Sequence, residues 1–409
     1  MSVIPFSKVE PRNVVATKFV YRDPKTIPPR ETLYAGHFIR GFVSLTVGIG
    51  GGGKSNLEIV DTLAMMSGRP LLGHSTEKPL KVWYINLEDP TVESERRFVA
   101  AALHHGIPST VLDENLFLDS GRDQEFVVLK NNQKGTTVVE TVVIGIIQQM
   151  EQRKIDVLIV DPFISAHEVD ENDNSKIQQA AALFVRIASE TNAAVEIVHH
   201  VKKGAGVGKI EVTADSGRGA GALKDKARSV RVINGMTAKE APKAGVAVDD
   251  RFDYFRVGNG KSNQGKRSGR TEWRRMISVN LGNGLHSWEP GDSVGVVIEW
   301  KWPSPETAIE IVEPDDFDKI KAVIAQGNCK ANVQAKDWVG NVVAEKLGLD
   351  LTIKDDKARA KLMIEGWIAG GHLRIVKRRC PLKREDKDFI DLAEVPHPNP
   401  GGADKVLHS

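Results

Sequence analysis

Short apolar runs alternate with longer amphipathic segments between about residues 36 and 300. The apolar runs lie at residues 42–47, 81–87, 155–160, 194–198 and 229–233. They are rich in Val, Ile and Leu and end at glycine or a polar residue, which is typical of buried strands. Apolar residues at helical spacing follow some of these runs, as at residues 177–188. Strands that alternate with helices predict a mainly parallel sheet flanked by helices, and therefore an α/β fold.

Two regions of the chain do not show this simple alternation of strand and helix patterns. Residues 138–153 contain Val and Ile, which favour a strand, but the segment is long enough to favour a helix, and we predict a helix. Before residue 36, five prolines predict an extended arm.

A second small domain follows the α/β region. Helical patterns at residues 315–326, 336–347 and 355–370 precede alternating apolar and basic residues at 373–379. Three helices and a hairpin are typical of a winged helix. The predicted organisation is an arm at 1–35, an α/β domain at 36–300, a linker at 301–314, a winged-helix-like α+β domain at 315–395 and a disordered tail at 396–409.

The composition excludes several classes of protein. Of the 409 residues, 41% are hydrophobic and 27% are charged, as in ordinary globular proteins. No apolar stretch is long enough to span a membrane and no secretory signal begins the chain, so we expect a cytoplasmic protein without a membrane partner. The only two cysteines, Cys329 and Cys380, are far apart, which excludes a disulfide scaffold and a cysteine-based metal centre.

Positive charge is concentrated in two segments, although the net charge of the chain is only +2. Residues 202–231 contain eight basic and three acidic side chains, and residues 251–275 contain eight basic and two acidic ones. Such clusters indicate either a binding surface for a polyanion or a solvated face.

The strongest motif is a glycine-rich stretch between a predicted strand and a predicted helix. Residues 48–55 fit the pattern G-x-x-x-x-G-K-[ST] of a P-loop. Glycines let successive backbone N–H groups surround the β- and γ-phosphates of a nucleotide, while the lysine supplies positive charge and the hydroxyl ligates Mg²⁺. We therefore predict ATP and Mg²⁺ as cofactors, bound by Gly48, Gly50, Gly51, Gly52, Gly53, Lys54, Ser55 and Asn56.

Two carboxylates follow predicted strands. Asp161 ends a buried strand, where a carboxylate is costly unless it faces the mouth of the sheet and holds a metal-bound water, so it is the Walker B candidate. Pro162 follows it, so the Asp-Glu pair of AAA+ proteins is missing and the catalytic base must come from elsewhere. Glu88 follows the 81–87 strand, which in a RecA-type sheet we expect next to the P-loop strand. We predict that Glu88 orients and deprotonates the attacking water.

The histidine pair that ends the fourth strand has two interpretations. His200 either senses the γ-phosphate, as a polar side chain at this strand end does in RecA-type ATPases, or His199 and His200 are ordinary histidines with one packed inside. We favour the sensor. The segment at 202–216 is glycine-rich and basic, as expected for a mobile loop that faces a central channel.

Two arginines flank a predicted short helix before the 229–233 strand. A ring ATPase needs a cation from the neighbouring subunit to neutralise charge at the γ-phosphate, and arginine suits this role. Either Arg218 or Arg228 is a candidate for this finger. The alternative for each is a surface ion pair with Asp215 or Asp225.

As a set, these segments resemble the RepA-like hexameric replicative helicases, a RecA-fold branch of the P-loop ATPases. The resemblance covers roughly residues 30–290 and rests on the segments 48–55, 84–89, 158–162, 199–204 and 218–228. It implies a RecA-like P-loop NTPase core that forms a hexameric homo-oligomer. It also implies roles by position: Glu88 as the catalytic carboxylate, Asp161 as Walker B, His200 as the sensor, Arg228 as the trans finger and Lys261 near the neighbour's nucleotide.

Three functions fit these features. The first is an ATP-hydrolysing ring that translocates on single-stranded DNA as a replicative-type helicase of a plasmid, phage or other mobile element. The second is a replication initiator or regulator whose winged helix binds duplex DNA without unwinding it. The third is a signalling ring ATPase without DNA, and the basic segments argue against it. Residues 374–387 carry seven basic and two acidic side chains, so the predicted wing binds either nucleic acid or a protein.

Overall fold

The structure is a computed structural model that describes residues 15–133, 135–201, 211–216, 219–262, 271–286, 290–303, 314–379 and 385–393. The chain divides after Glu31 into two units. In the first unit, residues 15–31 are exposed and contain one short helical turn, η1 (Pro24–Thr26). The predicted tail at 396–409 and most of the predicted loop at 202–216 lie outside the described residues.

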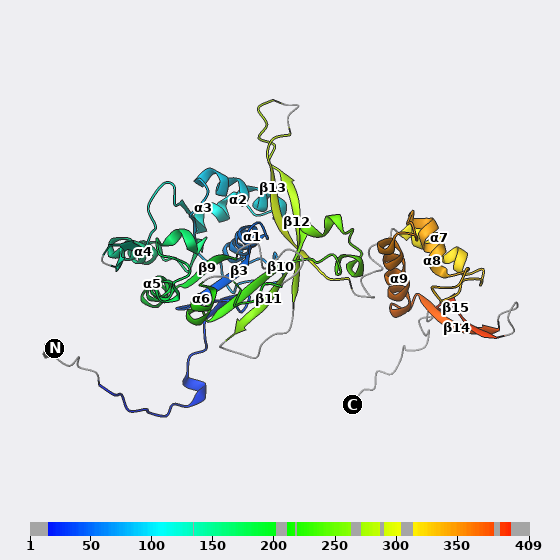
Figure 1. The fold of residues 1–409 in the computed structure, drawn as a ribbon, viewed down its shortest axis with the longest axis horizontal. Helices are drawn as coiled ribbons and strands as arrows, with labels where there is room; N and C mark the ends of the chain where they lie inside the picture. Colours follow the sequence, from blue (N-terminus) through cyan, green and yellow to red (C-terminus); the bar gives the residue numbers. More distant parts are fainter. Residues whose placement is uncertain are drawn as a thin grey trace, which may run out of the picture. The chain divides into compact units, whose positions relative to one another are not determined.

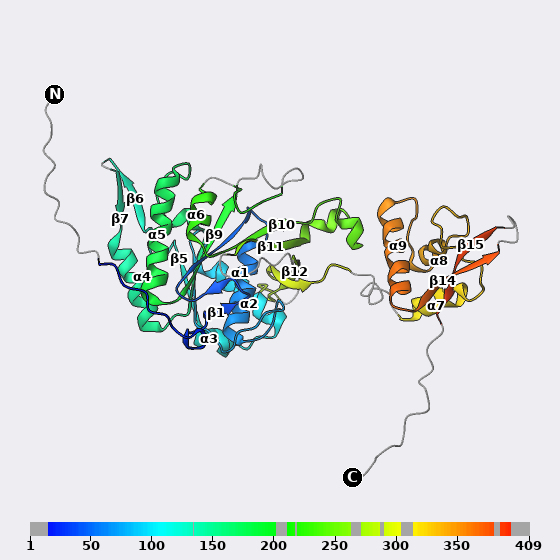
Figure 2. The same cartoon turned by 90° about the horizontal axis from the view of Figure 1, so that it is seen from below.

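The second unit contains a nine-stranded sheet (Figures 1 and 2), with its strands in the order β13-β12-β11-β10-β3-β9-β8-β4-β5. Its strands are β3 (Val43–Ile49), β4 (Val82–Asn86), β5 (Leu116–Ser120), β8 (Val157–Asp161), β9 (Ala194–Val201), β10 (Ser229–Gly235), β11 (Tyr254–Ser262), β12 (Glu272–Asn280) and β13 (Ser293–Trp300). The six strands from β10 to β5 are parallel, and β11, β12 and β13 extend the sheet antiparallel. The mainly parallel sheet confirms the predicted α/β fold.

Helices cover both faces of this sheet (Figure 1). One face carries α1 (Lys54–Ser67), α2 (Thr91–His105) and α3 (Ser109–Asn115), and the other carries α4 (Glu140–Arg153), α5 (Asn174–Thr191) and α6 (Ala220–Lys226). The helix predicted at 138–153 is confirmed by α4. Small hairpins complete the domain: β1 (Thr32–Tyr34) pairs with β2 (Phe38–Ile39), and β6 (Leu129–Asn132) pairs with β7 (Gly135–Val138).

The two hydrophobic cores follow from the alternation of side chains along the strands. On β8, Leu158 and Val160 pack into the core beneath α4 and α5, while Val157 and Ile159 pack into the core beneath α1 and α2. Since successive side chains of a strand point to opposite faces, a strand that is apolar throughout must be covered on both sides. The helices therefore cover the faces of the sheet but not the carboxyl ends of its parallel strands.

The C-terminal segment has a hydrophobic core of its own, which includes Phe317, Ile320, Trp338 and Trp367. It contains α7 (Pro314–Ile324), α8 (Val339–Leu347), α9 (Lys354–Ala369) and the antiparallel hairpin of β14 (Leu373–Arg379) with β15 (Asp386–Leu392). Three helices and a hairpin are therefore present where the sequence predicts them. In the described part of the chain, no helix is both long and apolar enough to span a membrane.

Candidate active site

The P-loop connects β3 to α1 at the carboxyl edge of the sheet. Gly51 and Gly53 have φ angles of +72° and +89°, which favour glycine. A Cβ at Gly53 would lie 2.9 Å from the ring of Phe255, so a larger residue does not fit there. Gly53 begins α1 without a side-chain cap, which leaves the backbone N–H groups of the first turn open to phosphate.

The P-loop lysine lies folded against the strand that precedes it. The Lys54 ammonium group donates hydrogen bonds to the carbonyl oxygens of Gly48 at 3.0 Å and Ile49 at 2.7 Å. Burial lowers the pKa of Lys54 to about 8, and the carboxylates of Asp161 and Glu88 oppose this shift. An ammonium group held at the P-loop is suited to neutralise bound phosphate.

Asp161 is buried at the end of β8, and three polar groups surround its carboxylate. The Tyr84 hydroxyl donates a hydrogen bond to Oδ2 at 2.7 Å, and His200 Nε2 lies 3.9 Å from Oδ1. Burial raises the pKa of Asp161, but the neighbouring His200, Ser55 and Tyr84 side chains outweigh burial and hold the pKa below its usual value. An ionised carboxylate beside the Ser55 hydroxyl is the donor set that Mg²⁺ prefers, so these residues fit the predicted ion.

Glu88 lies at the same edge of the sheet as Asp161, but not where we predicted. The strand that precedes it, β4, is separated from β3 by β9 and β8, so the expectation that it borders the P-loop strand is wrong. Asn86 pairs with Asp161 across β4 and β8, which places Glu88 just beyond Asp161. The Glu88 side chain is exposed, while its backbone N–H donates to Asn86 Oδ1 at 2.9 Å and its carbonyl accepts from Arg122 at 2.8 Å.

The two histidines at the end of β9 face different surroundings. His200 is level with Gly48 of β3, and a Cβ at Gly50 would lie 4.0 Å from its Nδ1. His199 is buried, with its ring 6.5 Å from that of Phe163. The structure therefore brings His200, and not His199, to Asp161 and the P-loop, while its role as a sensor stays a prediction.

Arg228 and Lys261 lie together at the opposite end of the sheet, where the parallel strands β3 and β10 begin. Arg228 directly precedes β10, its backbone N–H donates to Val43 at the start of β3, and its guanidinium lies 5.3 Å from the Phe42 ring centre. Val230 of β10 pairs with Lys261, and burial lowers the pKa of Lys261, opposed by Asp225 and assisted by Lys224 and Arg228. The other finger candidate, Arg218, lies outside the described residues.

The side chain of Asn56, which we predicted to bind the nucleotide, contacts the strands β12 and β13. Its amide donates to the Gly295 carbonyl at 2.9 Å and contacts the Met276 sulfur at 3.3 Å. The side chain therefore connects the first turn of α1 to β12 and β13, and the nucleotide role predicted for Asn56 remains untested.

Sequence reasoning missed three residues that shape this edge: Tyr84, Asn86 and Arg122. Tyr84 lies inside an apolar run, where nothing distinguishes it from a core residue. Asn86 gave a usable signal, because an amide at the end of a buried strand, two residues before the first of two carboxylates, needs hydrogen-bond partners. Its Oδ1 accepts from the backbone of both Glu88 and Asp89, which fixes the turn that presents Glu88.

We expect Tyr84→Phe to destabilise the protein by about 1 to 3 kcal/mol at pH 7, since it removes a donor from a buried carboxylate. The native pKa of Asp161 is depressed, so its contribution to stability is present above the usual pKa of about 4 and is lost as pH falls through the native value. The loss in Tyr84→Phe should therefore shrink in acid. Urea unfolding across pH measures this effect. The control is Tyr254→Phe, whose hydroxyl makes no hydrogen bond within the described residues, and equal losses in both variants at every pH would contradict the expectation.

Comparison with known proteins agrees with this site. A family model described as AAA domain matches residues 9–206. The chain is similar to the crystal structure of the RadB recombinase, with 15% identity over 59% of this chain and 89% of that chain and a TM-score of 0.39. It is also similar to a KaiC-like protein from Pyrococcus horikoshii, with 13% identity over 64% of this chain and 93% of that chain and a TM-score of 0.39. The family match covers just under half of the chain and includes the P-loop and Asp161, and together with the P-loop geometry it supports a P-loop ATPase domain.

Proposed function

We propose that this P-loop ATPase works as a homo-oligomeric ring, in which each nucleotide is hydrolysed between two subunits, and that the ring translocates on DNA as a replicative-type helicase. One observation carries the first step. The P-loop, Asp161 and His200 lie at one edge of the sheet, whereas Arg228 and Lys261 lie at the other.

The distance between the two edges explains why a neighbour is needed. Arg228 is held at Val43, and the P-loop begins at Gly48. At about 3.3 Å per residue, the strand between them is about 16 Å long. A finger on β10 is therefore far from the phosphates of its own subunit, while the same edge of a second subunit is free to approach them. Charge neutralisation by such a cation is a main source of rate in phosphoryl transfer.

The helicase step is tested by strand displacement on forked DNA. We expect unwinding with ATP and Mg²⁺, and none with a non-hydrolysable analogue or with Lys54→Ala. ATP hydrolysis that DNA stimulates, without displacement of a strand on either fork polarity, would favour the initiator or regulator instead. Hydrolysis that DNA leaves unchanged would contradict both DNA functions.

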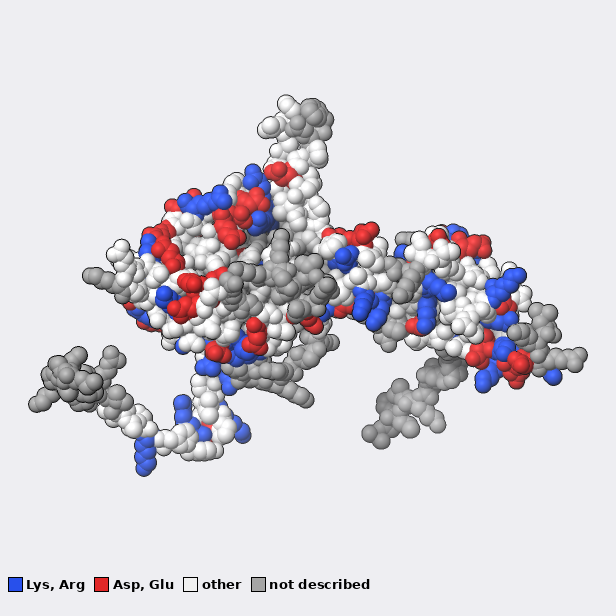
Figure 3. Space-filling view, in the orientation of Figure 1, with Lys and Arg blue, Asp and Glu red and all other residues white. Residues whose placement is uncertain are grey.

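The C-terminal hairpin has one feature that bears on the alternative function. In the register of β14 with β15, Arg374 pairs with Asp391, Lys377 with Asp388 and Arg379 with Asp386. Each of these basic side chains therefore faces an acidic one, and Figure 3 shows the two charges interspersed on the C-terminal segment. The hairpin is consequently less positive than the sequence count suggests, which weakens the support for a DNA-binding wing relative to a protein-binding one.

Residues 312–395, which enclose their own hydrophobic core, test the two alternatives: a DNA-binding domain should bind DNA with an affinity that falls steeply as salt rises. Lys377→Ala with Arg379→Ala should lower the slope of log affinity against log salt by about 2, since each phosphate contact contributes about 0.9. Lys319→Ala, on the exposed face of α7, is the matched control. A folded fragment without salt-sensitive binding, whose removal breaks up the oligomer, would identify an assembly domain.

A further inference from the structure

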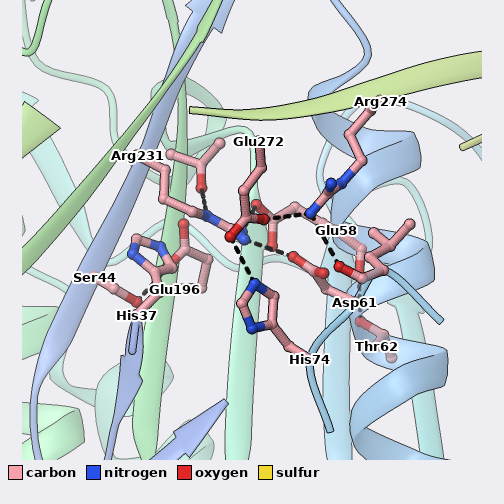
Figure 4. A network of polar contacts seen from close by, with 12 residues as sticks. His37, Ser44, Glu58, Asp61, Thr62, His74, Glu196, Arg231, Glu272 and Arg274 are labelled. Atoms are coloured by element: carbon pink, nitrogen blue, oxygen red, sulfur yellow. Dashed lines mark hydrogen bonds and ion pairs between the residues drawn. The ribbon is translucent and has the colours of Figure 1, made fainter. Parts of the chain in front are cut away.

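A buried polar network joins α1 to β10 next to the nucleotide site (Figure 4). At its centre, the Arg231 guanidinium donates to Glu58 Oε1 at 2.7 Å and to Asp61 Oδ2 at 2.6 Å. The Arg231 side chain is 11% exposed, and those of Glu58 and Asp61 are 0% and 3% exposed. The motifs of the nucleotide site include none of these three residues.

The guanidinium contacts both elements that flank the P-loop. Glu58 and Asp61 come four and seven residues after Lys54, so the three share one face of α1. Arg231 Nε lies 3.3 Å from the Thr46 hydroxyl of β3, and the two residues pair across β10 and β3. The Arg231 side chain therefore connects the strand before the P-loop to the helix after it.

This network is a costly way to hold a helix if stability alone is required. Burial raises the pKa of Glu58 well above its usual value, and Arg231 opposes this shift while Glu196 and Asp61 add to it. Apolar side chains of similar volume often stabilise a fold as well as a buried ion pair does. Apolar side chains, however, cannot replace the planar guanidinium group, whose N–H groups fix the orientation of two carboxylates at once.

We propose that Arg231 is a positioning residue for ATP hydrolysis: its fork sets the register of α1 against β3 and thereby places Lys54 and Ser55 at the phosphates. This inference rests on the proposed ATPase function. Arg231 is remote from the nucleotide, but it should still affect turnover, because a displacement of about 1 Å at reacting groups can cost about 10² in rate.

The main test is Arg231→Lys in the full chain. Lysine keeps the positive charge but is a point donor that cannot hold both carboxylates in one plane. We expect kcat to fall by about 10 to 10², with the affinity for a fluorescent ATP analogue changed less than about threefold. Amide hydrogen exchange of residues 50–57 should be faster than in the wild type, which reports the position of α1 without any turnover.

Arg274→Lys is the matched control for stability. Arg274 is a second buried guanidinium, 4% exposed, that contacts Glu272 and the carbonyl oxygens of Leu72 and Trp273, and makes no hydrogen bond to α1 or β3 in the described chain. We expect it to lower the urea midpoint as Arg231→Lys does, and to leave kcat and the exchange of residues 50–57 unchanged.

A second pair of variants keeps the test decisive if Arg231→Lys fails to fold. Glu58→Gln retains a side-chain carbonyl oxygen that accepts from Arg231, so kcat should stay within about twofold of the wild type. Glu58→Met has similar size but no comparable acceptor, so it should lose turnover as Arg231→Lys does.

The inference is overturned if folded Arg231→Lys keeps the wild-type kcat, if Arg274→Lys loses as much turnover, or if Glu58→Met and Glu58→Gln turn over equally fast. Failure of the proposed function has a different signature. In that case the wild type hydrolyses no ATP, while faster exchange of residues 50–57 in Arg231→Lys alone still shows that Arg231 positions α1.

Discussion

Replacing Arg228 with alanine is expected to lower kcat for ATP by about 10³ or more, the range for loss of an arginine finger. The expectation follows from the place of Arg228 at the start of β10, on the edge opposite the P-loop of its own subunit. Steady-state hydrolysis at saturating ATP measures the effect. Lys226→Ala, an exposed cation at the end of α6, is the control and should keep the wild-type rate.

Mixed rings test whether Arg228 acts across a subunit boundary. Arg228→Ala and Lys54→Ala subunits are each expected to be inactive alone. Mixing them creates interfaces with an intact P-loop on one side and an intact finger on the other, so part of the activity should return. If rings shown to be mixed recover none, the trans role of Arg228 is wrong, and Arg218 and Lys261 become the next candidates.

Glu88→Gln is expected to lower the rate of hydrolysis by about 10² or more, the range for loss of a general base, while nucleotide affinity stays nearly unchanged. Lys54→Ala should instead weaken binding, because Lys54 neutralises the phosphates. Titration of a fluorescent ATP analogue separates the two effects.

The control for Glu88→Gln is Asp89→Asn. Asp89 is the adjacent carboxylate, and it pairs with Arg97 of α2 at 3.0 Å, so we expect only a small change in rate. Wild-type hydrolysis by Glu88→Gln would show that the base lies elsewhere on this edge. Equal losses in both variants would indicate damage to the turn that Asn86 holds.

Five strands of the sheet, β3, β4, β8, β9 and β10, were predictable because each is a short apolar run that ends at glycine or a polar residue, whereas β5 and the antiparallel strands β11, β12 and β13 were not predicted. The order of the strands was only partly predictable. Strand β4 follows α1 in the chain, yet β9 and β8 intervene between it and β3. Crossover connections place strands by packing over the whole sheet, and apolar content does not distinguish a neighbour of β3 from a strand three positions away.

The buried network was beyond sequence reasoning for a related reason. Glu58 and Asp61 are charged residues on a helix, and such residues lie mostly on solvated faces. Their burial depends on Arg231, which is 170 residues or more away in the chain. The C-terminal hairpin shows the same limit, because a local count of charge cannot include Asp388 and Asp391, which the strand register places opposite basic residues.

The P-loop rests on residues that come late in the chain, and this affects where the catalytic unit can be cut. A Cβ at Gly53 would lie 2.9 Å from Phe255, and one at Gly48 would lie 3.1 Å from Ile233. Both neighbours follow residue 206, where the family match ends. Truncation at that point keeps the whole P-loop sequence, but it leaves β3 as an edge strand paired only with β9 and removes the side chains that pack against the P-loop glycines. Because Asn56 of α1 also contacts Gly295 of β13, we expect the smallest fragment with an intact P-loop to extend through β13, to Trp300.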